Sequence, residues 1–247
     1  MQALEGIKVI DFSKWLPGQY CGMLLGDYGA EVIKVEDVKG DSTRNFFPEK
    51  APGMSYWHLM LNRNKRGLAV DIRQKQGQEI LLKLLQDADV FLEGFRPGYL
   101  ARYGLDYETV HALNPRLVYC SITGFGQHCH KPAHDLNVVG LAGLNSLDDT
   151  GGACVPEVQV SAIGSGLNAL SAVCMALLAR ERTGSGQHLD VSLFATALSM
   201  QVTGISSRWG SEETGAAEFG RTAHYYNIYR TKAVSYTHLT LPTKLEV

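Results

Sequence analysis

The sequence predicts an α/β fold with a mostly parallel, doubly wound sheet of the Rossmann-like kind. Short runs rich in β-branched residues alternate with helical segments from residue 7 to about residue 202. The first unit is complete, with a β-rich run at residues 7–11, a helix opening at Pro17-Gly18, and a second run at residues 31–36. Strands joined through helices are parallel, because each crossover returns the chain to the same edge of the sheet.

The rest of the chain repeats this alternation. Further strands are predicted at residues 68–72, 89–93, 117–122 and 189–193. Helices are predicted at residues 77–86, 106–113, 166–182 and 195–202. The composition then becomes polar and glycine-rich between residues 203 and 220, which indicates a linker. Glu36 ends the second strand, where a dinucleotide-binding fold carries its ribose-binding acid, but without the glycine motif of such folds NAD binding is a weak alternative.

The composition of the chain is that of a cytoplasmic enzyme. The 247 residues are 45% hydrophobic and carry a net charge of −2, which gives no reason to expect nucleic acid or a membrane as partner. No apolar run approaches the roughly 20 residues of a membrane helix. The N-terminus lacks the features of a secretory signal. The five cysteines form an odd count without a CxxC pair, which is typical of a reducing compartment.

Three motifs lie where predicted strands meet loops, the position at which open α/β sheets bind ligands. They are Phe95-Arg96-Pro97-Gly98, Asn114-Pro115-Arg116-Leu117-Val118-Tyr119 and Ser121-Ile122-Thr123-Gly124-Phe125-Gly126. Together with residues 61–67, they resemble the class III CoA-transferase family, which includes formyl-CoA transferase, carnitine CoA-transferase and the α-methylacyl-CoA racemases. Further blocks at residues 29–36 and 179–192 match, and the resemblance extends from residue 4 to about residue 230.

The resemblance implies that the substrate is a coenzyme A thioester, with no tightly bound cofactor and no metal. A CoA thioester needs cations for its phosphates and apolar shelves for its adenine. Lys65, Arg66, Arg73, Arg96 and Arg102 are suitable cations. Asp37 and Gly94 depart from the family, which often has arginine and asparagine there. The residues that we expect to bind CoA are Trp15, Asp37, Val70, Arg73, Gly94, Phe95, Arg96 and Arg102.

The position of the family's catalytic aspartate is Ala162 in this chain. In the transferases, that carboxylate attacks the donor thioester and then carries CoA as an aspartyl thioester. Alanine supplies no nucleophile, so we expect the chain alone to be weak or inactive. Ser161 is adjacent, but a serine ester would be a poor relay back to CoA. Glu157 would need a register shift to take the role.

Three functions remain open. The first is acyl-CoA:carboxylate CoA transfer, in which CoA moves between a thioester and a small carboxylic acid. The second is 2-methylacyl-CoA epimerisation, because Ala133-His134-Asp135 matches the racemase motif and His134 is a plausible base. The third is a non-catalytic CoA-binding subunit, paired with a paralogue that supplies the aspartate. His134 could instead be structural.

The domain boundaries follow from the resemblance and the composition. Residues 1–202 are predicted to form the large CoA-binding domain, and residues 203–233 a linker with the start of a small domain. Residues 234–247 resemble a translated sequencing adapter and are predicted to be a non-native tail. The chain is therefore predicted to be truncated. The family implies a homodimer, or a heterodimer with a paralogue, for the full-length protein.

Overall fold

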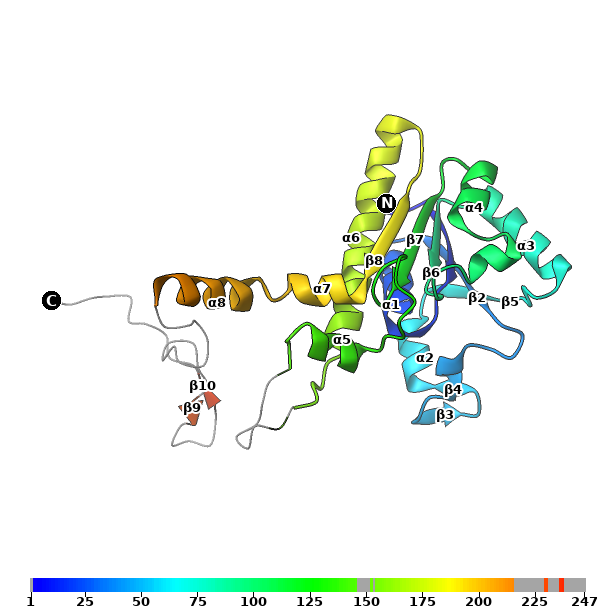
Figure 1. Ribbon diagram of the computed structural model, residues 1–247. Coiled ribbons are helices and arrows are strands. Elements are labelled where there is room, and N and C mark those ends of the chain that lie inside the picture. The colour runs from blue at the N-terminus through cyan, green and yellow to red at the C-terminus, as the bar shows by residue number, and fades with distance from the viewer. Residues whose placement is uncertain (1, 146–151, 153, 216–228, 231–235, 238–247) are drawn as a thin grey trace. The chain divides into compact units, whose positions relative to one another are not determined.

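The computed structural model describes residues 2–145, 152, 154–215, 229–230 and 236–237. Its centre is a six-stranded sheet with the order β5-β2-β1-β6-β7-β8, in which every neighbouring pair is parallel (Figure 1). The predicted α/β fold with a parallel sheet is therefore confirmed. The strands are β1 Lys8–Phe12, β2 Glu31–Glu36, β5 Lys65–Ala69, β6 Val90–Glu93, β7 Val118–Thr123 and β8 His188–Ser192.

Helices cover both faces of this sheet. On one face, α1 (Trp15–Asp27) and α6 (Val160–Thr183) pack against each other and the strands, and α3 (Lys75–Gln86) and α4 (Tyr107–Leu113) cover the other face (Figure 1). The side chains of adjacent residues in a strand point to opposite faces of the sheet. Val9 accordingly belongs to the core beneath α1 and α6, and Ile10 to the core beneath α3 and α4.

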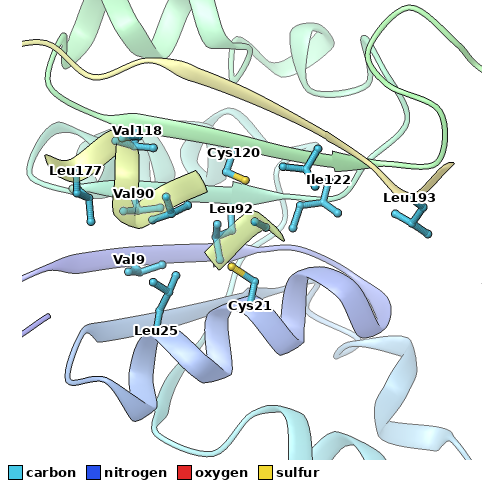
Figure 2. Packing of buried hydrophobic residues seen from close by; sticks show 14 of the residues in the cluster. Val9, Cys21, Leu25, Val90, Leu92, Val118, Cys120, Ile122, Leu177 and Leu193 are labelled. Carbon is cyan, nitrogen blue, oxygen red and sulfur yellow. The ribbon is translucent and has the colours of Figure 1, made fainter. Parts of the chain in front are cut away.

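The core beneath α1 and α6 is built mainly of aliphatic side chains, with Cys21 and Cys120 among them (Figure 2). Cys21 and Leu25 of α1 lie against Val9 and Leu92 of the sheet, and Leu177 of α6 belongs to the same cluster. All residues of β6 and of β7 are buried, as expected for central strands covered on both faces. This explains why short, continuous apolar runs predicted both strands correctly.

Two predicted boundaries are wrong. The predicted strand at residues 68–72 lies three residues too late, because β5 begins at Lys65. β5 is an edge strand with no buried residue, so its polar start carries no hydrophobic signal. The predicted helix at residues 166–182 begins six residues earlier, at Val160, which places Ala162 in its first turn. Gly164, Ser165 and Gly166 have weak helix propensity and hide this start.

Helix α6 has the length and apolar composition of a membrane-crossing helix. Ala169, Val173 and Ala176 are, however, buried in the core that this helix shares with the sheet. By contrast, Met175 and Leu178 on its other side are exposed. The compartment of the protein stays a prediction.

Short elements connect the larger ones, and the sequence pattern did not predict them. Their lengths are below those at which periodicity is informative. They are the 3-10 helices η1 Ser42–Asn45 and η2 Leu100–Tyr103, the hairpin β3 Glu49–Ala51 and β4 Met54–Ser55, and the helices α2 Tyr56–Leu61 and α5 Asp135–Leu141.

The chain divides into two compact units, Met1–Ala197 and Leu198–Val247. α7 (Leu193–Ser199) spans this division. Within the second unit, α8 (Val202–Thr214) occupies most of the stretch in which the composition predicts a linker, and none of its residues is buried. A pair of two-residue strands, β9 (Tyr229–Arg230) and β10 (Tyr236–Thr237), is also described. The domain boundaries and the origin of residues 234–247 stay predictions.

Candidate functional site

Seven of the eight residues predicted to bind CoA lie in the segments that follow four strands of the sheet. They are Trp15 after β1, Asp37 after β2, Val70 and Arg73 after β5, and Gly94, Phe95 and Arg96 after β6. Because these strands are parallel neighbours, the structure brings their carboxyl ends to one edge of the sheet. The strand order reverses between β1 and β6, which is where open sheets form a ligand crevice.

The β1–α1 turn and the β6 loop contact each other at this reversal. A Cβ atom placed on Gly94 would lie 3.5 Å from the backbone nitrogen of Lys14. The Nζ of Lys14 lies 5.1 Å from the centre of the Phe95 ring, within the range of a cation–π contact. Phe95 also packs edge-on against Phe12 at 4.8 Å and stacks on Tyr99 at 5.0 Å. Phe95 therefore joins the loop to the core and is only half-buried.

Asp37 and Arg73 pair with each other. Arg73 Nη2 lies 3.6 Å from Asp37 Oδ2, and Arg73 Nε donates to Asp71 Oδ1 at 2.7 Å. The hydrogen bond from Arg73 holds the pKa of Asp71 below its usual value. The arginine charge is thus balanced by two carboxylates, so a phosphate would have to compete with them. The ion pair with Arg73 explains why an acidic side chain is tolerated at position 37, where the family often has arginine.

Arg96 and Arg102 differ from Arg73 in this respect. Within the described part of the chain, neither has a carboxylate within ion-pair distance. Arg96 lies in the loop after β6, and Arg102 lies on η2, between Tyr99 and Tyr103 in the order of the chain. These two arginines are the better candidates for binding phosphate, since no acid beside them has to be displaced.

Trp15 occupies an unusual backbone conformation at the start of α1. Its φ is 62°, in the left-handed region that favours glycine. The indole is 41% exposed and lies edge-on to Phe46, with ring centres 6.2 Å apart. Phe46 in turn packs edge-on against Trp57 at 4.4 Å. Trp15 and Phe46 form an exposed aromatic surface beside the β1–α1 turn, backed by the half-buried Trp57 and suited to stacking a flat base.

A buried ionic network lies beneath the same turn. Lys65 Nζ donates to Asp11 Oδ2 at 2.8 Å and to the backbone oxygen of Gln19 at 2.8 Å. Lys34 Nζ donates to the backbone oxygen of Ser13 and lies 3.6 Å from Asp41. Burial alone would raise the pKa of Asp11, but Lys34 and Lys65 outweigh it and hold that pKa below its usual value. The network fixes the backbone that leads into Trp15.

Two of the basic side chains that we expected to bind CoA phosphates form ion pairs within the protein instead. The Lys65 side chain is only 1% exposed, so it is unavailable to a ligand. Arg66 pairs with Glu31 at 2.7 Å, and Glu31 is the first residue of β2, at the opposite end of that strand from the carboxyl edge. The motif at residues 61–67 therefore supports the fold, and its basic side chains do not face the candidate site.

The predicted catalytic position lies beside the β1–α1 turn. Ala162, in the first turn of α6, is 3% exposed and belongs to a small apolar cluster with Leu16 and Leu61. The methyl group thus points into packed side chains. Leu16 directly follows Trp15, so the start of α6 and the predicted CoA residues share one region of the molecule.

Asp135 contacts the predicted catalytic position directly, and sequence reasoning gave it no role. Asp135 Oδ1 accepts hydrogen bonds from the Ala162 backbone nitrogen at 2.9 Å and from Ser161 Oγ at 2.7 Å. His134 is exposed, and its backbone nitrogen donates to Asn137 Oδ1 at 2.7 Å. The signal available in the sequence was the acid next to His134, but the contact spans 27 residues along the chain.

A cavity of about 440 Å³ is lined by Glu93 at the carboxyl end of β6, by Ser121 of β7 and His188 of β8, and by Arg96 and Gln127. Glu93 lines it and is buried, and burial raises the pKa of this carboxyl to about 7. Ser121 Oγ lies 2.9 Å from His188 Nε2 in the same lining. Burial lowers the pKa of His188. An acid that ends an apolar strand run was the sequence signal for this cavity, and it was missed.

Comparison with known proteins identifies the family. The sequence model of CoA-transferase family III matches residues 4–244. The chain belongs to CoA-transferase family III. The solved structure of a CaiB/BaiF family protein from Brucella suis superposes with a TM-score of 0.83 at 33% identity, covering 95% of this chain and 65% of that one. The predicted family and the predicted α/β fold are therefore confirmed.

Named relatives of this family III chain are CoA-transferases. The succinate–glutarate CoA-transferase of Agrobacterium fabrum is 40% identical over 203 residues, which cover 77% of this chain and 50% of that protein. The succinyl-CoA:glutarate CoA-transferase of Mus musculus is 35% identical over 242 residues, covering 94% of this chain and 55% of that protein. The chain spans about half the length of the curated relatives it matches.

Proposed function

We propose that this chain is the CoA-binding part of an acyl-CoA:carboxylate CoA-transferase. The observation that carries the proposal is the shared edge of the sheet, at which β1, β2, β5 and β6 deliver the predicted binding residues. The exposed aromatic surface at Trp15 offers a shelf for adenine, and Arg96 and Arg102 offer positive charge for phosphates.

The acyl partner and the acceptor are small carboxylic acids in this proposal. Relatives are named for succinyl, glutarate and oxalate substrates, so a short dicarboxylate is the first acceptor to test. We infer that the full-length protein acts as a homodimer or as a heterodimer with a paralogue. No tightly bound cofactor is needed, since the thioester itself carries the transferred group.

Two other functions have an observation in their favour. The buried methyl group of Ala162 favours a non-catalytic CoA-binding subunit, because it offers no reacting atom. The exposed side chain of His134, next to the residue that contacts Ala162, favours an epimerase that exchanges the proton α to the thioester. Solvent deuterium entering the acyl chain would mark the epimerase, whereas CoA moving between carboxylates would mark the transferase.

Isothermal titration of the chain with CoA tests the binding proposal. We expect Arg96→Ala and Arg102→Ala each to weaken binding about tenfold, which corresponds to about 1.4 kcal/mol. The matched control is Arg66→Ala, which removes an exposed arginine paired with Glu31 and should leave the affinity unchanged. Equal loss in all three variants, or no binding by the parent chain, would contradict the proposed site.

A further inference from the structure

Glu93, the last residue of β6, holds the loop that carries three of the predicted CoA-binding residues. Its Oε2 atom accepts a hydrogen bond from the backbone nitrogen of Phe95 at 2.8 Å. Phe95 lies beyond the end of the strand, so the carboxyl takes the place of the backbone acceptor that a strand residue would have. The Glu93 side chain therefore fixes the direction in which the chain leaves the sheet.

The loop after β6 is packed closely on two sides. A Cβ atom placed on Gly94 would lie 3.5 Å from the backbone nitrogen of Lys14 and 3.6 Å from the backbone oxygen of Ile122. Gly94 thus lies between the β1–α1 turn and β7. Because the loop fills this space, the hydrogen bond to Phe95 sets its conformation within narrow limits.

The carboxyl of Glu93 also lines the cavity of about 440 Å³ to which Arg96 contributes. Glu93 is 5% exposed, so water screens its charge poorly when it ionises. Arg96 is exposed and is one of the two arginines that we propose for the CoA phosphates. An ionised Glu93 therefore places a negative charge in the cavity of the cation that phosphate requires.

A chain of hydrogen bonds gives the neutral form of Glu93 a partner for its proton. Ser121 is hydrogen-bonded to Glu93, and its Oγ lies 2.9 Å from Nε2 of His188. Burial lowers the pKa of His188, which favours a neutral imidazole that can accept from Ser121. A hydroxyl both donates and accepts, so Ser121 can at the same time accept the proton of Glu93.

We propose that Glu93 is a positioning residue for CoA and that its neutral form is the form that favours binding. The inference rests on the proposed function, because it requires CoA at the loop after β6. A neutral carboxyl still accepts from the Phe95 amide and keeps the loop in place. An ionised carboxylate keeps that bond but opposes the phosphates. Binding of CoA is therefore coupled to uptake of a proton at Glu93.

The groups around Glu93 allow this change of charge near neutral pH. Burial raises the pKa of its carboxyl to about 7; the charge of Asp190 on β8 adds to the rise, and hydrogen bonds from Ser121 and the Phe95 amide oppose it. On β1 the residue paired with Glu93 is Phe12, which carries no charge. Besides Arg96, the other titratable groups that line the cavity are Tyr119 of β7, His188 of β8, His128 after β7, and Asp106, Tyr107 and Glu108 at the start of α4.

Two other acids of the cavity have different surroundings. Asp190 accepts a hydrogen bond from the Gln127 backbone nitrogen at 2.9 Å, so it holds the loop after β7. Glu108 is exposed in the first turn of α4, where water screens its charge. Glu93 is the acid that combines burial with a hydrogen bond to the loop after β6.

Isothermal titration with CoA at pH 6 and pH 9 tests the inference on the parent chain and three variants. Glu93→Gln keeps a side-chain oxygen for the Phe95 amide but cannot ionise. Glu93→Leu has a similar size and removes the acceptor. The matched control Glu108→Gln removes an exposed acid from the same cavity. Ionisation of the CoA phosphates affects all four proteins alike, so comparison with Glu93→Gln isolates the contribution of Glu93.

We expect the affinity of the parent chain, relative to Glu93→Gln, to fall about tenfold between pH 6 and pH 9. Glu93→Leu should bind about tenfold more weakly than Glu93→Gln at both pH values, because the Phe95 N–H group loses its acceptor. Glu108→Gln should follow the parent chain. Circular dichroism checks that each variant is folded, and if Glu93→Leu is not, the comparison of parent and Glu93→Gln decides.

Three results would overturn the inference while leaving the CoA site intact. They are an affinity ratio of parent to Glu93→Gln that does not change with pH, full affinity in Glu93→Leu, and loss of the pH dependence in Glu108→Gln. Absence of CoA binding by the parent chain at both pH values would reject the proposed function, and the inference with it.

Discussion

Two corners of the candidate site are held in different ways. Beneath the β1–α1 turn, buried lysines and aspartates bind one another and backbone oxygens of the turn and of α1. At the start of α5 and α6, one partly exposed carboxylate joins the two helices through hydrogen bonds to Ser161 and Ala162. The first corner lies beside residues predicted to bind CoA, and the second lies at the predicted catalytic position, Ala162.

This difference determines how rigidly each corner is held. A buried network is costly to disturb, because removal of one charge leaves its partner desolvated and unpaired. It therefore suits a loop that must keep one shape. A partly exposed carboxylate keeps contact with its surroundings and can form new bonds. Substitutions at the two corners should consequently have very different costs.

The largest expected effect comes from Lys65→Met, which leaves Asp11 buried with one lysine fewer. We expect the free energy of unfolding to fall by about 3–5 kcal/mol, as for other broken buried ion pairs. Urea denaturation followed by circular dichroism measures it. Arg63→Met is the matched control, since its pair with Asp27 is more exposed and should contribute far less to the free energy of unfolding. Equal losses in both variants would remove the distinction between the two kinds of pair.

The pH dependence of stability should reveal Glu93, which ends β6 between the two corners. Burial raises its pKa from 4.5 to about 7, so the folded chain keeps a proton that the unfolded chain releases between these values. Stability should therefore fall by about 3 kcal/mol as the pH rises from 4.5 through 7, relative to Glu93→Gln. Urea titrations of both proteins at pH 5 and pH 8 measure the difference. Parallel pH profiles would show that Glu93 ionises normally.

The smallest effect is expected at the second corner. Asp135→Ala removes the acceptor for Ser161 and Ala162, and should lower the free energy of unfolding by about 1 kcal/mol, as loss of a helix cap does. Asp135→Asn keeps the acceptor and should stay close to the parent chain. Thermal unfolding of the three proteins measures this. A loss as large as that of Lys65→Met would mean that the two corners are equally rigid.

Much of the fold was predictable because its central strands are covered on both faces. Residues 90–93 and 118–123 are buried throughout, so local composition alone indicates them. Parallel connection then places the ends of β1, β2, β5 and β6 at one edge, and the predicted residues with them. The start of β5 was not predictable in this way, because an edge strand without buried residues has no apolar pattern.

The contacts within the site were beyond sequence reasoning. Lys65 is suited to a phosphate by its type, and only the fold shows that it binds Asp11, 54 residues away. Asp135 and Ala162 likewise meet across 27 residues. Such pairs depend on how helices return to the sheet, and a single sequence does not encode that in any local pattern. The absence of the family's aspartate is evident from the identity of residue 162 alone. The contact between Asp135 and that position is evident only from the structure.

The left-handed backbone of Trp15 has a consequence for the stability of the chain. An L-residue with a side chain loses roughly 1–2 kcal/mol in this conformation, and glycine would lose almost none. A glycine at position 15 would relieve this strain while removing the exposed indole. The chain is therefore less stable at this turn than it could be, in exchange for an aromatic surface that solvent and ligands can reach.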